Sequence, residues 1–140
     1  MNNLFRMEFS ANLRNVSFAR TTVATFLFDL DLTLNVINEI KTIVSEAVTN
    51  AIYHGYECDD SQLVGLIVTY EDNLLTIVVK DTGKGIPDIE KAKEPLFSTK
   101  KNEERAGLGF TIMEIFSDEL EVKSAINEGT TVICKKRLEI

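Results

Sequence analysis

Three polar residues that could hold a metal ion or transfer a proton recur every four positions within the apolar pattern of residues 36–55: Glu46, Asn50 and His54. This spacing predicts that they share one stripe of a helix, with Glu46 and Asn50 at the edge of its apolar arc. A carboxylate and an amide at a core boundary are costly unless they are paired or coordinate something. Their oxygens suit Mg²⁺, and a carboxylate can act as a general base. On the evidence of this helix alone, the favoured interpretation is that these residues form a capped or solvated polar edge without a ligand.

A second feature is the segment Asp81-Thr82-Gly83-Lys84-Gly85-Ile86, which directly follows a β-rich run. Gly83 and Gly85 allow the backbone to turn sharply and to approach a ligand. Asp81, at the end of the strand, could accept a hydrogen bond from an amino group such as that of adenine. On its own, the pattern favours a plain turn.

Two further glycine segments follow. Arg105-Ala106-Gly107-Leu108-Gly109-Phe110 opens a predicted helix, where free backbone N–H groups suit phosphates and Arg105 could reach a terminal phosphate. A glycine-rich loop without a ligand is the alternative. The segment matches neither the G-x-x-x-x-G-K-[ST] loop nor a Rossmann unit. Gly129-Thr130-Thr131, taken in isolation, is a hairpin turn.

Apolar periodicity predicts the elements that position these segments. Thr33 or Asn35 could cap the second helix, and Gly55 could end it. Residues 88–106 are polar and charged and include Pro95, which predicts a long mobile connection. The expected elements are a strand at 4–10, helices at 12–29 and 36–55, a hairpin at 63–70 and 74–80, a loop at 81–87, a helix at 107–117 and a hairpin at 120–125 and 130–138.

This order of elements predicts the fold class. Hairpins dominate, so we expect an α+β two-layer sandwich whose mixed sheet is mainly antiparallel and carries the helices on one face. No linker rich in Pro, Gly or Ser interrupts the chain, which predicts a single domain over residues 1–140.

Composition excludes some partners. A net charge of -7 over 140 residues disfavours general nucleic-acid binding and binding to acidic membranes. No apolar run approaches the ~20 residues needed to span a bilayer, and the first residues do not form a signal peptide. Cys58 and Cys134 form no metal motif and are expected to be reduced thiols. We therefore expect a cytoplasmic protein.

The four segments, taken together and in order, resemble the motifs of a known superfamily, although none of them is specific alone. Glu46-x-x-x-Asn50, Asp81-x-Gly83-x-Gly85, Gly107-x-Gly109 and Gly129-Thr130 resemble, in this order, the four boxes of the gyrase, histidine-kinase and MutL ATPase superfamily. The resemblance implies a Bergerat ATP-binding fold, with ATP or ADP and Mg²⁺ as ligands. The segment between the second and third boxes would be the ATP lid.

A closer resemblance covers nearly the whole chain. Met7-Glu8-Phe9-Ser10, Ser45 to Ile52, His54-Gly55-Tyr56-Glu57, Glu94-Pro95-Leu96-Phe97 and Gly109 to Glu114 are similar to the sporulation anti-sigma F factors. This resemblance implies a homodimeric anti-sigma factor and protein serine kinase. Such proteins hold a sigma factor inactive when ATP is bound and phosphorylate an anti-anti-sigma factor on serine, and the unphosphorylated anti-anti-sigma factor displaces the sigma factor.

The same resemblance implies roles for individual residues. Glu46 would be the catalytic base, Asn50 would hold Mg²⁺, and Arg105 would act on the phosphates. The lid, residues 91–105, is rich in lysine, and each lysine could clamp phosphate or simply be solvated. The implied nucleotide contacts are Asn50, His54, Asp81, Gly83, Gly85, Ile86, Thr99, Lys100, Gly107, Leu108, Gly109, Phe110 and Thr130.

Two surfaces could bind partners. Arg20 falls opposite much of the apolar set of the first helix, so we expect it to be exposed and available to a partner protein. Phe5, Met7 and Phe9 alternate along the first strand and could pair edge to edge between protomers, or simply pack in the core.

Three other functions stay open. The chain could be an anti-sigma kinase for another sigma factor, such as a stress sigma factor. It could be the ATPase half of a histidine kinase, although that function predicts an upstream helix pair with an exposed histidine. It could also be a binding module that uses ATP only to set its shape, although such a module would not need Glu46 as a base.

Overall fold

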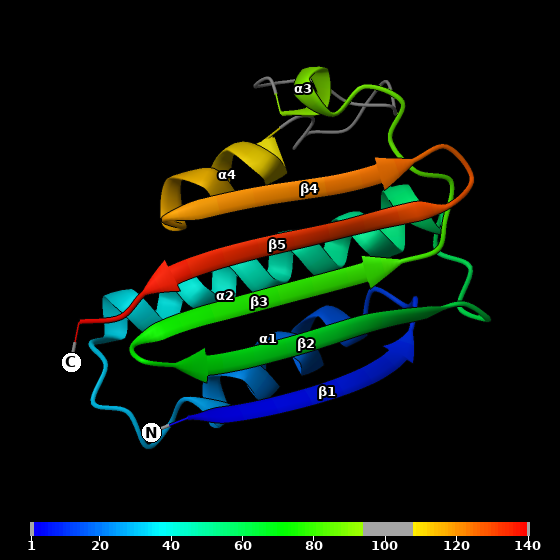
Figure 1. Cartoon of the computed structure of the whole chain (residues 1–140). Coiled ribbons are helices and arrows are strands. Elements are labelled where there is room, and N and C mark those ends of the chain that lie inside the picture. Colours follow the sequence, from blue (N-terminus) through cyan, green and yellow to red (C-terminus); the bar gives the residue numbers. More distant parts are fainter. Residues whose placement is uncertain (1, 94–107, 140) are drawn as a thin grey trace.

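The computed structural model describes residues 2–93 and 108–139. One layer is a five-stranded sheet in the order β1-β2-β3-β5-β4, and α1, α2 and α4 cover one of its faces (Figure 1). The elements are β1 (Asn3–Ser10), α1 (Asn15–Phe26), α2 (Leu34–Thr49), η1 (Asn50–Gly55), β2 (Leu63–Glu71), β3 (Leu74–Asp81), α3 (Ile89–Ala92), α4 (Leu108–Phe116), β4 (Glu119–Ala125) and β5 (Gly129–Arg137).

The two-layer α+β prediction is confirmed, with one difference in the sheet. All four strand pairings among the described residues are antiparallel, so the described sheet is not mixed. The reason is the connectivity: β2–β3 and β4–β5 are hairpins, and β5 lies against β3 in the antiparallel sense.

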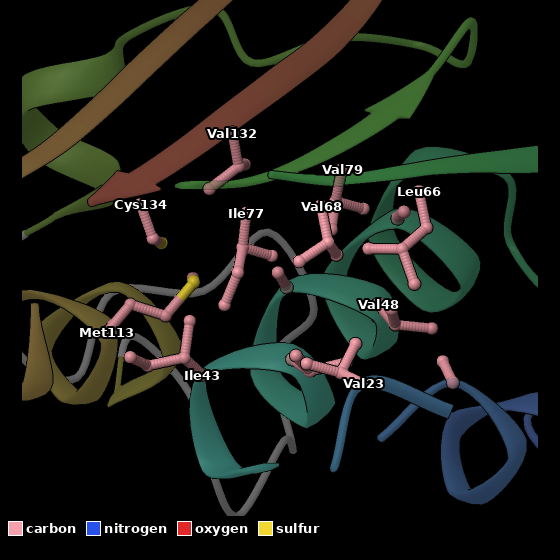
Figure 2. Close-up of a cluster of buried hydrophobic side chains, with 14 of the residues drawn as sticks. Val23, Ile43, Val48, Leu66, Val68, Ile77, Val79, Met113, Val132 and Cys134 are labelled. Atoms are coloured by element: carbon pink, nitrogen blue, oxygen red, sulfur yellow. The ribbon is translucent and has the colours of Figure 1, made fainter. Parts of the chain in front are cut away.

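The core lies between the sheet and the helices. Side chains alternate along β2 and β3, so that every second residue is buried, which is the pattern of a sheet with one covered face. Figure 2 shows Ile43 of α2 and Met113 of α4 below Ile77 and Cys134 of the sheet, and Val48 of α2 below Leu66. Phe9 is buried in this core, and Phe5 and Met7 pack against it.

The second predicted helix is not a single α-helix. Thr33 caps it as expected, because its hydroxyl accepts a hydrogen bond from the Val36 N–H at 3.3 Å. The α-helix ends at Thr49, and Asn50–Gly55 form a π-helical turn. The Tyr56 N–H accordingly donates to the Ala51 carbonyl, five residues back, at 3.0 Å. Gly55 is the last helical residue, as predicted.

The prediction of a mobile connection over 88–106 is wrong at its start. Ile89–Ala92 form the short helix α3, because Asp88 caps it by accepting a hydrogen bond from the Lys91 N–H at 3.1 Å, and Ala92 is buried. Residues 94–107, which include the rest of this connection and of the lid, lie outside the described residues. Within the described ranges, no helix has the length and apolarity required to cross a membrane.

Candidate nucleotide-binding site

The second and fourth predicted motifs, residues 81–86 and 129–131, meet at one end of the sheet. The end of η1, which continues the helix of the first motif, lies at the same place. The loop after β3 packs against the end of η1, where the Lys84 N–H donates to the Gly55 carbonyl at 3.1 Å. A Cβ on Gly83 would lie 2.1 Å from that carbonyl oxygen, so only glycine allows this approach. A Cβ on Gly55 would lie 2.8 Å from the carboxyl carbon of Asp81. Asp81 therefore lies directly against the end of the helical segment.

The fourth motif lies at the same end of the sheet, because Asp81 and Thr130 are opposite each other in the β3–β5 pair. Gly85 adopts a φ of +77°, and a Cβ there would lie 2.1 Å from the Ala125 carbonyl oxygen of the β4–β5 hairpin. The Asn127 N–H also donates to the Lys84 carbonyl at 2.7 Å. The loop of residues 82–86 is thus enclosed between η1 and this hairpin.

Asp81 is a buried carboxyl group, 8% exposed. Burial raises its pKa above the ordinary value, while the backbone N–H groups of Gly83 and Thr130 act in the opposite direction. The Gly83 N–H donates to Asp81 Oδ1 at 2.9 Å, which fixes the carboxyl group at the start of the loop. A buried carboxyl held in this way can accept a directed hydrogen bond from a ligand.

Glu46 and Asn50 lie together against the first turn of α4. Glu46 is 4% exposed and Asn50 is half-buried. A Cβ on Gly109 would lie 3.1 Å from Asn50 Nδ2 and 3.2 Å from Glu46 Oε2. The prediction that both side chains lie at the core boundary is confirmed. They lie directly beside the start of α4, whose first N–H groups have no acceptor within the helix.

His54 does not lie on a regular α-helical stripe with Glu46 and Asn50, although the four-residue spacing predicted one. It lies in the π-helical turn, where hydrogen bonds span five residues. The α-helical stripe that joins Glu46 to Asn50 therefore does not continue regularly to His54. Its half-buried ring packs edge to face on Tyr53, with ring centroids 5.2 Å apart.

The other predicted site residues divide into three groups. Leu108 is the first residue of α4, and Phe110 is buried in the core, so its side chain serves packing. Ile86 is partly buried against the core. Arg105, Thr99, Lys100 and Gly107 lie outside the described residues.

Arg20, the predicted partner-binding residue, is half-buried rather than exposed. It follows the fully buried Ala19 on α1 and so lies beside the packed stripe of the helix, where a long aliphatic stem can cover apolar surface.

Sequence reasoning gave no role to Tyr56 and Ser124, whose hydroxyls bond the two ends of the loop of residues 82–86. Ser124 could have been found from the sequence, because it takes the inward position of the alternation set by Leu120 and Val122. Tyr56 offered no comparable pattern, since its partners are distant in the chain.

Among the described residues, no group of three His, Cys, Asp or Glu side chains could enclose a metal ion. Mg²⁺ that binds with a nucleotide takes one or two protein oxygens and completes its shell with phosphates and water. The Asn50 amide oxygen, 3.3 Å from the position of a Cβ on Gly109, is a donor of the right kind beside the start of α4.

Comparison with known proteins agrees with this geometry. The model of the histidine kinase-like ATPase domain matches residues 9–136. The RsbU and RsbW domains of a Mycobacterium tuberculosis protein superpose with a TM-score of 0.67 at 19% identity, over 97% of this chain and 32% of that chain. The mycobacterial sensor histidine kinase MprB superposes with a TM-score of 0.60 at 17% identity, over 98% of this chain and 97% of that chain.

The chain belongs to the histidine kinase-like ATPase family, a class of nucleotide-binding domains. Within that family it groups with the anti-sigma F factors. It is 54% identical to the anti-sigma F factor of Geobacillus kaustophilus, over 99% of this chain and 94% of that protein. It is 49% identical to the anti-sigma F factor of Clostridium perfringens, over 99% of both chains.

Proposed function

We propose that the protein is an anti-sigma factor for a sporulation sigma factor of the F type and a protein serine kinase. In the ATP state it holds the sigma factor inactive, and with Mg-ATP it phosphorylates an anti-anti-sigma factor on serine. Its identity to anti-sigma F factors over nearly the full length supports the first activity. The kinase activity is supported by the burial of Glu46 beside Asn50 and the first turn of α4.

The nucleotide binds at the end of the sheet that carries Asp81. The Asp81 carboxylate accepts a hydrogen bond from the adenine amino group, and Thr130, paired with it across β3–β5, supports the adenine side. Free N–H groups in the first turn of α4 receive the phosphates. Arg105 and Gly107, with Thr99 and Lys100 of the lid, complete the phosphate contacts.

Glu46 is the base of the phosphotransfer. It accepts the hydroxyl proton of the substrate serine while the serine oxygen bonds to the γ-phosphorus and the bond from that phosphorus to the β-phosphate oxygen breaks. Asn50, one helical turn away, holds Mg²⁺. When bound, Mg²⁺ neutralises the charge on the phosphate oxygens. Glu46 is 4% exposed, so little bulk water reaches its carboxylate.

The protein acts as a homodimer, and the open face of the sheet supports this part of the proposal. One row across that face places the half-buried Ile67, Val78 and Ile133 between the exposed Arg6 and Glu121. If a second copy packs face to face about a two-fold axis along β3, Arg6 lies over Glu121 of the other copy and the apolar residues meet. Stacked sheets commonly pack in this aligned manner.

Charge reversal tests the dimer. We expect Arg6→Glu alone and Glu121→Arg alone each to weaken self-association about tenfold, measured by sedimentation equilibrium. The double variant should restore it, because each protomer then again offers opposite charges. A double variant as weak as either single variant would remove the face-to-face arrangement, and β1, a sheet edge whose outer side no described strand pairs, would be the next surface to test.

The protein acts in the cytoplasm, where an anti-sigma factor meets its sigma factor. Arg20, half-buried on α1, contacts these partners through its guanidinium. Arg20→Glu should weaken binding of the sigma factor and of the anti-anti-sigma factor in a pull-down assay. Unchanged binding of both would remove Arg20 from the interface.

Phosphotransfer tests the kinase activity. The purified protein is incubated with γ-labelled Mg-ATP and the anti-anti-sigma factor of the same organism. We expect an acid-stable label on that protein, reduced about 10²- to 10⁴-fold by Glu46→Gln because a general base is removed. Glu39→Gln is the matched control, since Glu39 lies on the same helix but pairs with Lys136 at 3.0 Å.

The other outcomes are equally informative. An acid-labile label would indicate phosphohistidine and the histidine-kinase alternative. Binding of ATP without any label would leave a nucleotide-gated binding protein, and Glu46 would lose its catalytic role. Labelling of the anti-anti-sigma partner of a stress sigma factor in preference to the sporulation one would change the sigma factor but keep the mechanism.

A further inference from the structure

The loop of residues 82–86 is fastened at each end by a hydroxyl group from another element. We propose that Tyr56 and Ser124 are positioning residues of the nucleotide site, which hold this loop and, through it, Asp81 in the conformation that binds adenine. The inference rests on the proposed function, because it assigns these residues to the nucleotide site described there.

Tyr56 fastens the beginning of the loop. Its side chain is buried, and its hydroxyl accepts a hydrogen bond from the Thr82 N–H at 2.7 Å while donating to the Leu63 carbonyl at 2.8 Å. The Thr82 hydroxyl lies 3.1 Å from the same oxygen. One oxygen atom thus joins the end of η1, the start of β2 and the residue that directly follows Asp81.

Ser124 fastens the end of the loop. Its hydroxyl accepts a hydrogen bond from the Ile86 N–H at 2.7 Å. The same oxygen lies 3.0 Å from the Gly129 carbonyl and 2.8 Å from the Thr130 hydroxyl. Since a serine hydroxyl has one proton and two acceptor sites, these neighbours use its full capacity. Ser124 therefore links the loop to the residues that face Asp81 on β5.

Between these two points the loop makes its own contacts with Asp81 and Gly55, through the N–H groups of Gly83 and Lys84. Fastening both ends limits the conformations in which these contacts are lost. When only a fraction of molecules holds the binding conformation, the apparent dissociation constant rises by the inverse of that fraction. Tyr56 and Ser124 would thus act on affinity and on base selectivity, without touching the nucleotide.

Tyr56→Phe tests the proposal, with Tyr70→Phe as the matched control. Tyr70 is also buried, and its hydroxyl also makes a hydrogen bond, to Asn73 Oδ1 at 2.8 Å, but at the opposite end of the sheet. Calorimetric titration with ADP and with GDP gives the affinity and the ratio of the two constants, and urea unfolding of each variant gives its stability.

We expect Tyr56→Phe to weaken ADP binding about tenfold and to narrow the preference for ADP over GDP, because a loosened Asp81 no longer distinguishes the adenine amino group. Tyr70→Phe should lose comparable stability and keep both the affinity and the ratio. Ser124→Ala should act like Tyr56→Phe to a smaller extent, about threefold, and Ser124→Thr, which keeps the hydroxyl, should recover binding. If Tyr56→Phe does not fold, the two Ser124 variants carry the same test.

Two results would overturn the inference, and they are distinguishable. If the unsubstituted protein binds no adenine nucleotide, the proposed function itself is wrong. If it binds ADP, and Tyr56→Phe and Ser124→Ala bind ADP and GDP with unchanged constants, the nucleotide site stands and Tyr56 and Ser124 have only a structural role.

Discussion

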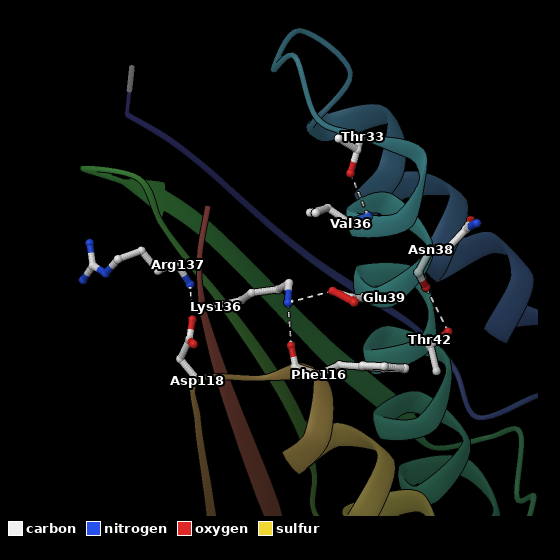
Figure 3. Close-up of polar contacts among 9 residues, drawn as sticks. All are labelled: Thr33, Val36, Asn38, Glu39, Thr42, Phe116, Asp118, Lys136 and Arg137. Carbon is white, nitrogen blue, oxygen red and sulfur yellow. Dashed lines mark hydrogen bonds and ion pairs between the residues drawn. The ribbon is translucent and has the colours of Figure 1, made fainter. Parts of the chain in front are cut away.

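The two ends of the sheet use polar groups in different ways. At the end opposite the site, polar side chains join secondary-structure elements to one another: Lys136 Nζ bonds Glu39 Oε1 at 3.0 Å and the Phe116 carbonyl at 2.7 Å, and the Arg137 N–H donates to Asp118 Oδ2 at 2.6 Å (Figure 3). At the site end, polar side chains hold the backbone of a single loop, as the bonds from Gly83 to Asp81 and from Ile86 to Ser124 show.

Because of this difference, polar groups at one end of the sheet should contribute mainly to stability, and those at the other end also to nucleotide binding. Bonds such as that of Lys136 close the ends of β5, α4 and α2 on each other, so their loss should cost free energy of unfolding and leave the site unchanged. Bonds to the loop of residues 82–86 also fix the positions of Asp81 and its neighbours, so their loss should weaken nucleotide binding as well as stability. Substitutions at the two ends should therefore affect unfolding and nucleotide binding in different proportions.

The largest effect is expected from Gly83→Ala. The new Cβ would lie 2.1 Å from the Gly55 carbonyl oxygen and 2.5 Å from its carbon, and this backbone cannot move aside cheaply. We expect a loss of about 3 kcal/mol in unfolding free energy and of all measurable ADP binding. Gly65→Ala is the control, because its Cβ would meet its nearest atom at 3.7 Å, and it should leave ADP affinity unchanged.

Lys136→Met should lower stability without affecting nucleotide binding. It removes the ammonium that bonds Glu39 and the end of α4, at a site where the lysine side chain is 15% exposed. We expect a loss of about 2 kcal/mol in unfolding free energy, measured in urea, with ADP affinity unchanged. If Lys136→Met weakens ADP binding as much as Tyr56→Phe does, the separation between the two ends does not hold.

The smallest effect concerns the pH dependence of stability. Because burial raises the pKa of Asp81 in the folded state, the folded protein binds its proton more tightly than the unfolded chain does. Stability should therefore fall as pH rises from the unfolded value of 3.8 through the raised folded value, by at most about 1.4 kcal/mol per pH unit.

Asp81→Asn should remove this contribution. The variant should gain stability relative to the unsubstituted protein as pH rises from about 4 to about 7, as measured by urea unfolding, while ADP binding weakens. A stability difference that does not change with pH would contradict the assignment of a raised pKa to Asp81.

Local pattern predicted most of the fold because the relevant interactions are local. The periodicity of α2, the Thr33 cap and the two hairpins all depend on residues within a few positions of each other. The place of Glu46 at the edge of the apolar arc was also predicted, but its burial, 4% exposed, was not. The π-helical turn could not be predicted in this way, because the apolar residues of the sequence continue through Asn50–Gly55 with the spacing of an α-helix.

The hydrogen bonds that fasten the loop were not predictable for the opposite reason, although the inward position of Ser124 on β4 was. The bond from Thr82 to Tyr56 spans 26 positions and that from Ile86 to Ser124 spans 38, so each depends on how the elements pack. Arg20 is a similar case: the helical pattern placed it away from the apolar set, but its place next to the buried Ala19 leaves it half-buried.

Backbone amide chemical shifts of the labelled protein during titration with Mg-ADP test directly where the nucleotide binds. We predict that the amides of residues 50–56, 81–86 and 124–130 shift together, while those of residues 70–74 and 136–138, at the other end of the sheet, remain unchanged. Shifts concentrated at residues 136–138, or no shifts at saturating ADP, would contradict the assignment of the nucleotide site to the end of the sheet that carries Asp81.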